Sequence, residues 1–364
     1  MTDAIVNFKK SIKDYTLSTP EKKPKENYIN ILILRELKSA ARFTTDGLEA
    51  NSAVICIGSL EATVGKLFGR KQVASDRRKA KSLQRTLLAA NEMGNDWKGC
   101  TMSVNEMCQK CPECALFGSA ASKEKMSITS RVMYDEAYTI RNLNAVVEDY
   151  FQNAPGDDYL KGTSTAIREP DFFKEGTLFP CVVTLRDVTP EEVLFFLNIT
   201  DRNSRYGATS TRFGKMENHI LGVYASHREG PSSLEVARGI ALKLAEKEES
   251  QEDEPYENEN NTPVNDKEKL EGNNNKKPEN EKTMSPNDKL KRIMNRDTLS
   301  VEEVKTFAVE VYKFLSNKHR IEYVEFDETQ TKEILNDLKD DKVVRSILVD
   351  QIGKLGDFLK VQGA

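Results

Sequence analysis

The chain has 364 residues, of which 38% are hydrophobic and 31% are charged, and its formal net charge is -4. This length allows one large domain or two of ordinary size, and the composition is typical of a soluble protein with some non-globular content. Residues 1–10 contain no apolar stretch behind basic residues, and the longest apolar runs are too short to cross a bilayer. We therefore expect no signal peptide, no membrane span and a cytoplasmic location.

The charge is unevenly distributed along the chain. Residues 1–250 carry 35 Lys+Arg against 33 Asp+Glu, a balance of +2, whereas residues 251–364 carry 19 against 25, a balance of -6. The acidic excess lies in the C-terminal third, so the net charge does not argue against a polyanionic partner for the remainder.

Strand and helix patterns alternate in the first part of the chain. Tyr28–Leu37 is rich in β-branched and aliphatic residues and predicts a central strand, which ends in a turn at residues 44–47. A short strand follows at Val54–Ile57. The apolar residues of Ser82–Met93 fall roughly on one helical face, and Ile128–Ile140 alternates in part, which predicts another strand.

The pattern continues through the middle of the chain. Phe151–Asp171 is long and polar, and we expect a loop or a hairpin that projects from the body. Leu178–Arg186 predicts a strand, Thr189 followed by Pro190 predicts the start of a helix, and Ser233–Lys247 has helical apolar spacing. This mixed α+β order is compatible with a ferredoxin-like or RRM-like sheet within residues 1–245.

The last third differs in composition. Residues 246–283 contain few large apolar side chains and are rich in Glu, Asn and Lys, so we expect a disordered linker or insertion. Residues 284–364 predict an all-helical C-terminal region, which contains a capping-box pattern that starts at Ser300.

A basic run lies between residues 66 and 85. Eight cations in it stand against a single acid, Asp76, which favours a phosphate-contacting surface, although a solvated helix face is the alternative. The eight are Lys66, Arg70, Lys71, Arg77, Arg78, Lys79, Lys81 and Arg85.

Four of the six cysteines fall within fifteen residues. Cys108, Cys111 and Cys114 repeat at two-residue gaps, and Cys100 precedes them. Zinc takes four ligands tetrahedrally, and a Cys-x-x-Cys turn presents two sulfurs to one ion. The pattern predicts a structural zinc site closed by Cys100, Cys108, Cys111 and Cys114, within an insertion at about residues 60–127; a cluster of free thiols in a reducing compartment is the alternative.

Several motifs together resemble a known family. Cys-Pro-Glu-Cys-Ala-Leu-Phe-Gly-Ser at 111–119, followed by Ser-Arg-Val-Met-Tyr-Asp-Glu-Ala at 130–137, resembles the signature of the RAMP superfamily of CRISPR-associated proteins. Arg-Tyr-Gly at 205–207, Arg-Phe-Gly at 212–214 and Gly222 are similar to the glycine-rich loop of that superfamily. Over residues 28–245 the chain most resembles the crRNA-binding backbone subunits of type I-D interference complexes, which are Cas-seven type proteins.

The resemblance implies a modified RRM-like palm with insertions, one of them zinc-bound. It also implies copies that oligomerise head to tail along crRNA, with a protruding hairpin that displaces bases at intervals. Together with the other subunits of the complex, these copies would present the guide for pairing with target DNA. Relatives of this type are not themselves the nuclease.

A protein that holds any guide must contact phosphate and sugar, for which cations and glycine-loop amides are suited. Tyr206 and Phe213 could stack on bases or pack locally, and Arg131 could reach RNA or pair with Asp135. The RNA-binding candidates are Arg42, Lys66, Arg70, Lys71, Arg77, Arg78, Lys81, Arg85, Arg131, Arg205, Tyr206, Gly207, Arg212, Phe213 and Gly214.

Catalysis has little support in the sequence. In type III relatives an aspartate in an early loop cleaves target RNA, and Asp46 is placed for that role, although an Asp before Gly is most often a turn residue. His219, His227 and His319 show no metal-ligand spacing, and no Gly-x-Ser-x-Gly motif is present. We expect a non-enzymatic scaffold; the alternatives are a type III-like endonuclease that uses Asp46 with a divalent metal, and a zinc-knuckle adaptor that binds protein.

Overall fold

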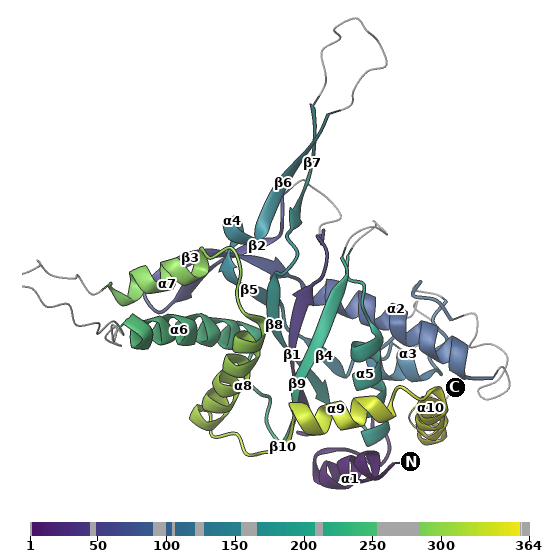
Figure 1. Cartoon of the computed structure of the whole chain (residues 1–364). Coiled ribbons are helices and arrows are strands. Elements are labelled where there is room, and N and C mark those ends of the chain that lie inside the picture. Colours follow the sequence, from purple (N-terminus) through teal and green to yellow (C-terminus); the bar gives the residue numbers. More distant parts are fainter. Residues whose placement is uncertain are drawn as a thin grey trace, which may run out of the picture.

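The structure is a computed structural model that describes residues 2–43, 49–89, 100–103, 106–120, 127–153, 166–207, 214–252, 284–356 and 358. Its largest sheet has five antiparallel strands (Figure 1). In spatial order these are β10 (Tyr323–Asp327), β9 (Met216–Ser226), β1 (Tyr28–Leu37), β8 (Leu178–Arg186) and β4 (Val132–Tyr134).

The central strand β1 is buried on both faces. Every residue from Ile29 to Leu37 is buried, and the strand pairs along its length with β8 on one side and β9 on the other. Alternate residues point to opposite faces of a sheet, so a strand covered on both faces needs a continuous apolar run. The predicted central strand is therefore confirmed.

Helices α2 (Gly69–Leu87) and α5 (Pro190–Arg202) cover one face of this sheet. Along the chain, α2 lies between β1 and β4, and α5 lies between β8 and β9. Ile31 and Ile33 of β1 share the core on this face with Phe195 of α5. Two helices thus pack on the same face of the four strands β9, β1, β8 and β4.

The opposite face carries a second apolar core. Leu32 and Leu34 of β1 pack with α6 (Ser233–Glu252), α7 (Pro286–Met294) and α8 (Val301–Lys318). A three-stranded sheet contributes to the same core and contains β2 (Ser52–Ile57), β3 (Leu60–Leu67) and β5 (Ala137–Asn142). The molecule therefore has helices on both sides of the central sheet (Figure 1).

A two-stranded antiparallel hairpin projects from this body (Figure 1). It consists of β6 (Val147–Asn153) and β7 (Ala166–Phe173), and the short helix α4 (Leu143–Val146) precedes it. The prediction of a loop or hairpin at residues 151–171 is confirmed for the described part, since residues 154–165 lie outside the described residues. The remaining elements are α1 (Asp3–Ser11), a 3-10 turn (Lys13–Tyr15), α3 (Pro112–Phe117), α9 (Glu328–Asp337) and α10 (Asp341–Leu355).

Two predicted helix starts are confirmed. Thr189 and Glu192 form a complete capping box at the start of α5, with Pro190 in the first turn. At α8, the Ser300 side chain accepts a hydrogen bond from the Glu303 amide at 3.4 Å. Both interactions satisfy amide groups that a helix leaves without an internal partner.

Two predicted elements differ from the structure. The helix predicted at Ser82–Met93 begins at Gly69 and ends at Leu87. The single strand predicted at Ile128–Ile140 is two strands, β4 and β5, which pair in different sheets on either side of residues 135–136. The apolar alternation continues across the point where the chain passes from one sheet to the other, so the pattern predicts a single strand.

The C-terminal prediction also needs correction. The region expected to be all-helical contains β10, which pairs with β9 and extends the main sheet. Helix α6 continues past Glu246 to Glu252, into the segment expected to be disordered, whereas residues 253–283 lie outside the described residues. No helix in the described part of the chain has the length and apolarity that crossing a bilayer requires.

Candidate metal centre and nucleic-acid interface

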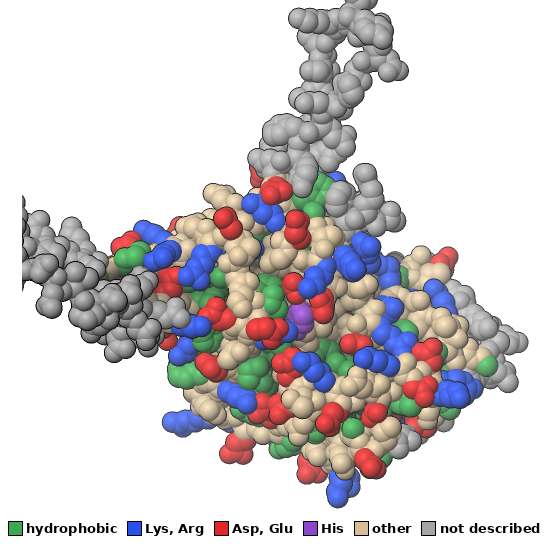
Figure 2. All heavy atoms as spheres, in the orientation of Figure 1, with side chains coloured by type: hydrophobic (Ala, Val, Ile, Leu, Met, Phe, Trp, Pro, Cys, Tyr) green, Lys and Arg blue, Asp and Glu red, His purple; other side chains and the backbone are tan. Residues whose placement is uncertain are grey.

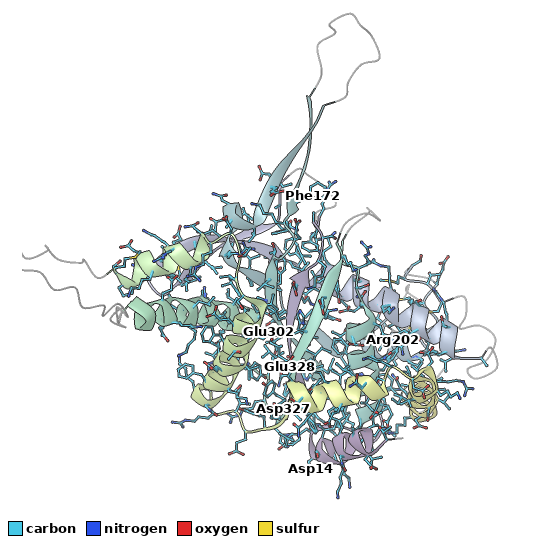
Figure 3. All side chains as sticks on the ribbon, in the orientation of Figure 1. Asp14, Phe172, Arg202, Glu302, Asp327 and Glu328 are labelled. Atoms are coloured by element: carbon cyan, nitrogen blue, oxygen red, sulfur yellow. The ribbon has the colours of Figure 1, made fainter. Side chains whose placement is uncertain are left out.

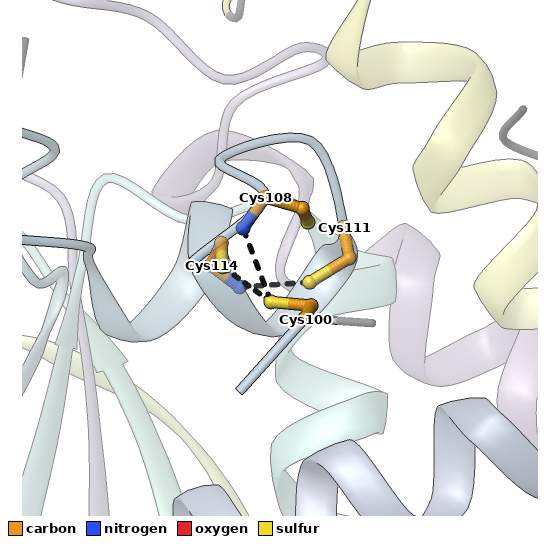
Figure 4. Close-up of side chains that lie close together, drawn as sticks. All are labelled: Cys100, Cys108, Cys111 and Cys114. Carbon is orange, nitrogen blue, oxygen red and sulfur yellow. Dashed lines mark hydrogen bonds between the residues drawn. The ribbon is translucent and has the colours of Figure 1, made fainter. Parts of the chain in front are cut away.

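The four predicted cysteine ligands come together in the structure (Figure 4). The Sγ atoms of Cys100, Cys108, Cys111 and Cys114 all lie within 4.8 Å of one another. Tetrahedral bonds of about 2.3 Å to zinc would place sulfurs about 3.8 Å apart. The Cys100 and Cys114 sulfurs are 3.5 Å apart, so the cluster (Cys100, Cys108, Cys111 and Cys114) has the spacing of a possible metal site and is compatible with zinc.

Local backbone geometry turns these sulfurs toward one another. Cys111 is the N-cap of α3, and its Sγ accepts the Cys114 amide at 3.5 Å. The Cys108 amide donates to the Cys100 Sγ at 3.2 Å, and the Lys110 amide donates to the Cys108 Sγ at 3.4 Å. Such N–H···S bonds offset negative charge on thiolates and fix their orientation, which a metal centre requires. No disulfide joins the cysteines in the described chain.

The side chain of Lys81 supplies positive charge directly beside the cysteine cluster. Its Nζ lies 3.0 Å from the Cys100 Sγ and 2.6 Å from a carboxylate oxygen of Glu113, which is fully buried. Burial lowers the pKa of the Lys81 ammonium, but Glu113 and Cys100 raise it by more, so the pKa lies above its ordinary value. Hydrogen bonds from the other three thiols, with Cys108 first, lower the pKa of Cys100. Four thiolates around one zinc leave a net negative charge, which this ammonium would compensate.

Two further cations of α2 hold the same segment. The Arg77 Nε donates to Glu113 at 2.5 Å, and its Nη2 donates to the Gly118 carbonyl at 2.8 Å. Arg85 is exposed, and its Nη2 donates to the Cys100 carbonyl. The prediction that Arg77 and Lys81 face RNA is corrected here, because both are occupied by protein partners and Lys81 is only 3% exposed.

Arg131 is also an interior residue. Its guanidinium forms two hydrogen bonds with the Glu192 carboxylate, one of them 2.7 Å long, and Glu192 is fully buried. The same group donates to the carbonyls of Ala115 and Asp187, both at 3.1 Å. Arg131 thus joins the cysteine segment to the start of α5, and its carboxylate partner is Glu192 in place of the suggested Asp135.

The first half of α2 buries polar rather than apolar side chains. Asp76 is fully buried and accepts hydrogen bonds from the Tyr134 hydroxyl at 2.7 Å and from Tyr206 and Asn203 at 2.6 Å each. Its other neighbour is Arg35, with an N–O distance of 3.6 Å. Because apolar periodicity was the signal for this helix, a polar buried stripe explains why the sequence placed its start too late.

Tyr206 is therefore unavailable for base stacking. Its ring is 1% exposed, the Arg35 guanidinium lies 4.7 Å from the ring centre, and burial raises the pKa of its hydroxyl. Of the two interpretations, local packing is the correct one. Its neighbour Arg205 is exposed, and the Ser75 hydroxyl of α2 donates to the Arg205 carbonyl.

Gly207 and Gly214 have backbone conformations that favour glycine, with φ of 155° and 80°. A Cβ at Gly214 would lie 1.8 Å from the Tyr206 carbonyl oxygen, and one at Gly207 would lie 3.3 Å from the Arg42 carbonyl oxygen. The close approach is thus to protein backbone. Arg212, Phe213 and Asp46 lie outside the described residues.

Gly214→Ala is expected to lower the free energy of unfolding by more than Gly176→Ala does. Gly176 has a similar φ of 71° but nothing within 4 Å of an added Cβ, so it isolates the backbone strain of about 1–2 kcal/mol. Urea unfolding of the two variants measures the difference. Equal losses would show that contact with Tyr206 is not what demands glycine at position 214.

Cations also gather around a surface groove between α2 and the end of α5. This basic groove has a volume of about 290 Å³. Its lining residues are Ser75, Arg78, Lys79, Ser82, Arg202, Asn203, Ser204 and Arg205. None of these is acidic, and Arg202 is labelled in Figure 3.

The charge of the basic groove is only partly neutralised. Within the described part of the chain Arg78 is exposed and forms no ion pair, whereas Arg202 pairs with Asp341 at 2.7 Å. Burial lowers the pKa of the Lys79 ammonium most, and repulsion by the positive charge of Arg202 lowers it further. An anion would relieve this repulsion. No sequence motif marks Arg202 as part of this groove, because its approach to α2 is a property of the tertiary fold.

The other candidates lie near the start of α2. Lys66 pairs with Glu136 at 3.2 Å, and its Nζ lies 4.3 Å from the centre of the Phe68 ring. Arg70 is exposed, with its guanidinium 4.9 Å from the same ring. Lys71 and Arg42 are partly exposed.

Comparisons with known proteins agree with this architecture. A family profile described as Csc2 Crispr matches residues 7–321. No curated protein matches the chain. Among solved structures, the chain is similar to Csc2 of Thermofilum pendens, with a TM-score of 0.59, 16% identity and 100% of both chains covered. That likeness shows a shared fold.

Two weaker likenesses are to parts of larger assemblies. A chain from a type IV-B CRISPR complex has a TM-score of 0.36 and 14% identity, with 52% of this chain and 90% of that chain covered. A chain from a CRISPR RNA-guided surveillance complex has a TM-score of 0.36 and 11% identity, with 57% and 74% covered.

Proposed function

Because this chain belongs to the Csc2 CRISPR family, we propose that it is a non-catalytic backbone subunit that binds crRNA in a type I-D interference complex. In this proposal, copies of the chain associate head to tail along the guide, beside other subunits, and leave its bases free to pair with target DNA. The complex acts in the cytoplasm in antiviral defence.

The topology supports an RRM-like or ferredoxin-like palm. Strands β1, β4, β8 and β9 lie in the order β9-β1-β8-β4, and α2 and α5 connect β1 to β4 and β8 to β9. This is a βαββαβ arrangement with both helices on one face. The projecting β6–β7 hairpin is our candidate for the element that displaces bases, since it extends away from the palm (Figure 1).

The observation that carries the proposal is the basic groove. It has four cations and four neutral polar side chains in its lining and no acidic one, which suits a ribose-phosphate backbone and not a particular base. Hydroxyl and amide groups from Ser75, Ser82, Asn203 and Ser204 could share the phosphate oxygens with these cations. A guide of any sequence could then be held in the same way.

The set of proposed RNA-contacting residues is therefore smaller than the set predicted from the sequence. Arg77, Lys81, Arg131 and Tyr206 are assigned to the protein interior. Lys79 and Arg202 are added from the basic groove. The retained candidates are Arg42, Lys66, Arg70, Lys71, Arg78, Arg85, Arg205, Gly207 and Gly214, together with Arg212 and Phe213, which are carried from the sequence alone.

We further propose that the cysteine cluster holds one structural zinc ion. All four ligand positions would be filled by sulfur, which leaves no position for a reactive water. The metal would keep the Cys100–Gly118 segment folded, and Arg77 and Lys81 would transmit that order to α2. The basic groove lies on the same helix, so zinc would support RNA binding indirectly.

Charge reversal at two positions tests the RNA contact. The double variant Arg78→Glu/Arg205→Glu is expected to bind single-stranded RNA more weakly, to a similar degree for all sequences. It should also have a shallower dependence of log affinity on log salt, by about 0.7 for each phosphate that the variant no longer neutralises. Fluorescence anisotropy with labelled oligonucleotides measures both quantities.

Lys318→Glu is the matched control, because Lys318 is exposed at the end of α8, which packs on the opposite face of the sheet. It should leave affinity and slope unchanged. If the double variant, folded as judged by thermal unfolding, binds as tightly as the unmodified chain, the basic groove is not the RNA-binding surface.

A further inference from the structure

A second cluster of metal-ligand side chains lies on the central sheet, away from the cysteine cluster. Glu36 of β1 stands opposite Glu217 of β9, and His219 follows two residues later on the same face of β9. One ligand atom from each of the three lies within 4.8 Å of the others. The His219 Nε2 is 2.9 Å from a Glu36 carboxylate oxygen.

These side chains line a cavity that solvent can enter. It has a volume of about 540 Å³ and lies between the strands and the starts of α8 and α9. Glu302 and Glu328, labelled in Figure 3, contribute to its wall. Figure 2 shows this face, with a histidine among acidic and basic side chains. The Glu36 and His219 side chains are only 11% and 14% exposed, so packing against the protein fixes their positions.

A lysine ammonium already lies where these carboxylates favour a cation. The Lys38 Nζ is 2.8 Å from Glu36 and 3.0 Å from Glu217. Its side chain is 40% exposed, so it can move into solvent without opening the core. The Lys38 amide, in contrast, is fixed by the Lys215 carbonyl at 2.8 Å.

We propose that Glu36, Glu217 and His219 form a divalent-cation site whose place Lys38 takes when no ion is bound. One imidazole and two carboxylates on a single face, with open positions for water, suit Mn²⁺ or Fe²⁺, whereas thiolates suit zinc. The three ligands come from two paired strands and need no rearrangement of the backbone. The bound ion would link β1 to β9 next to the Gly214–Lys215 segment, and it does not depend on RNA or on the cysteine cluster.

Titration of the full-length chain with Mn²⁺, followed by loss of the free-ion signal in electron paramagnetic resonance, tests this site. The unmodified chain is expected to bind one Mn²⁺, and His219→Asn to bind it about tenfold or more weakly. His227→Asn is the matched control, because the ring of His227 lies against the Tyr15 ring and its Nδ1 is 3.2 Å from the Glu26 carbonyl, so it takes no part in this cluster. It should bind Mn²⁺ as the unmodified chain does.

The variant Lys38→Met is expected to change the Mn²⁺ affinity in the opposite direction. It removes the competing ammonium and should tighten Mn²⁺ binding about tenfold or more, a gain that partial unfolding cannot imitate. The proposal is overturned if Lys38→Met fails to tighten binding, or if His219→Asn, with unchanged thermal unfolding, binds Mn²⁺ as tightly as the unmodified chain.

Discussion

Removal of the proposed zinc ion from the cysteine cluster is expected to unfold the Cys100–Gly118 segment before the rest of the protein. Four thiolates that converge within 4.8 Å repel one another once the ion is gone, and no disulfide in the described chain replaces it. Structural zinc contributes about 10–16 kcal/mol of apparent folding free energy in small zinc-binding peptides. We therefore expect one zinc per chain, and a large loss of protection in this segment after chelation, measured by hydrogen exchange.

Cys111→Ser should reproduce the effect without a chelator, because Cys111 is both a ligand candidate and the N-cap of α3. Cys56→Ser is the control, since Cys56 is exposed on β2 and remote from the cluster. A chain that is purified without stoichiometric metal, yet protects this segment fully, would contradict the zinc site. The alternative of four free thiols would then hold.

Arg131→Met is expected to destabilise the protein by about 3–5 kcal/mol, because it leaves the fully buried Glu192 carboxylate without a counter-charge. The carbonyls of Ala115 and Asp187 lose their donors in the same variant. The loss should be visible as a lower midpoint in urea unfolding. Arg186→Met is the control, since Arg186 is about 39% exposed and its pair with Asp187 is long, at 3.5 Å.

A second substitution separates an interior role from an RNA-binding role for this residue. Glu192→Gln keeps a side chain that can complete the capping box with Thr189, and in combination with Arg131→Met it should recover part of the lost stability. The folded fraction of Arg131→Met should bind RNA as the unmodified chain does. A stable Arg131→Met protein with reduced RNA affinity would instead place Arg131 at the interface.

How far the sequence predicted this structure depends on what each segment buries. Strands β1 and β8 bury apolar residues on both faces, and their continuous apolar runs were recognised. The sequence pattern does not predict strand β9, although it pairs with the whole of β1, because Glu217 and His219 line a cavity that solvent can enter and Gly222 lies near the middle of the strand. The absent side chain of Gly222 leaves room for the Tyr224 ring, which a Cβ would approach to 3.0 Å or less.

The candidate site also contains one part that the sequence predicts and one part that it does not. The cysteine spacing predicted the convergence of four sulfurs, since a Cys-x-x-Cys turn is local. The basic run could not be resolved into its parts from sequence, because Arg77 and Lys81 turn toward Glu113 while Arg78 turns toward solvent. No local sequence pattern identifies Glu113 as the partner of Arg77 and Lys81. Glu113 is brought to them by the tertiary fold.

Helix α2 contacts both the cysteine cluster and the segment that carries Arg205. Ser75 and Asp76 hold the segment that carries Arg205 and Tyr206, and Lys81, one and a half turns later, holds the cysteine cluster. The polar side chains on the buried side of α2 have different protein partners. The helix can therefore be rich in basic residues although about half of it is buried. Its exposed cations are those available to a polyanion.

In the proposed function, this chain binds the phosphate backbone of RNA without regard to base sequence. The most direct measurement is the affinity of the full-length protein for two unrelated single-stranded RNAs of equal length, across a range of salt concentrations. We predict equal affinities that fall linearly in log–log form, with a slope of about -0.7 for each phosphate that the protein neutralises. No binding at low ionic strength, or an affinity indifferent to salt, would contradict it.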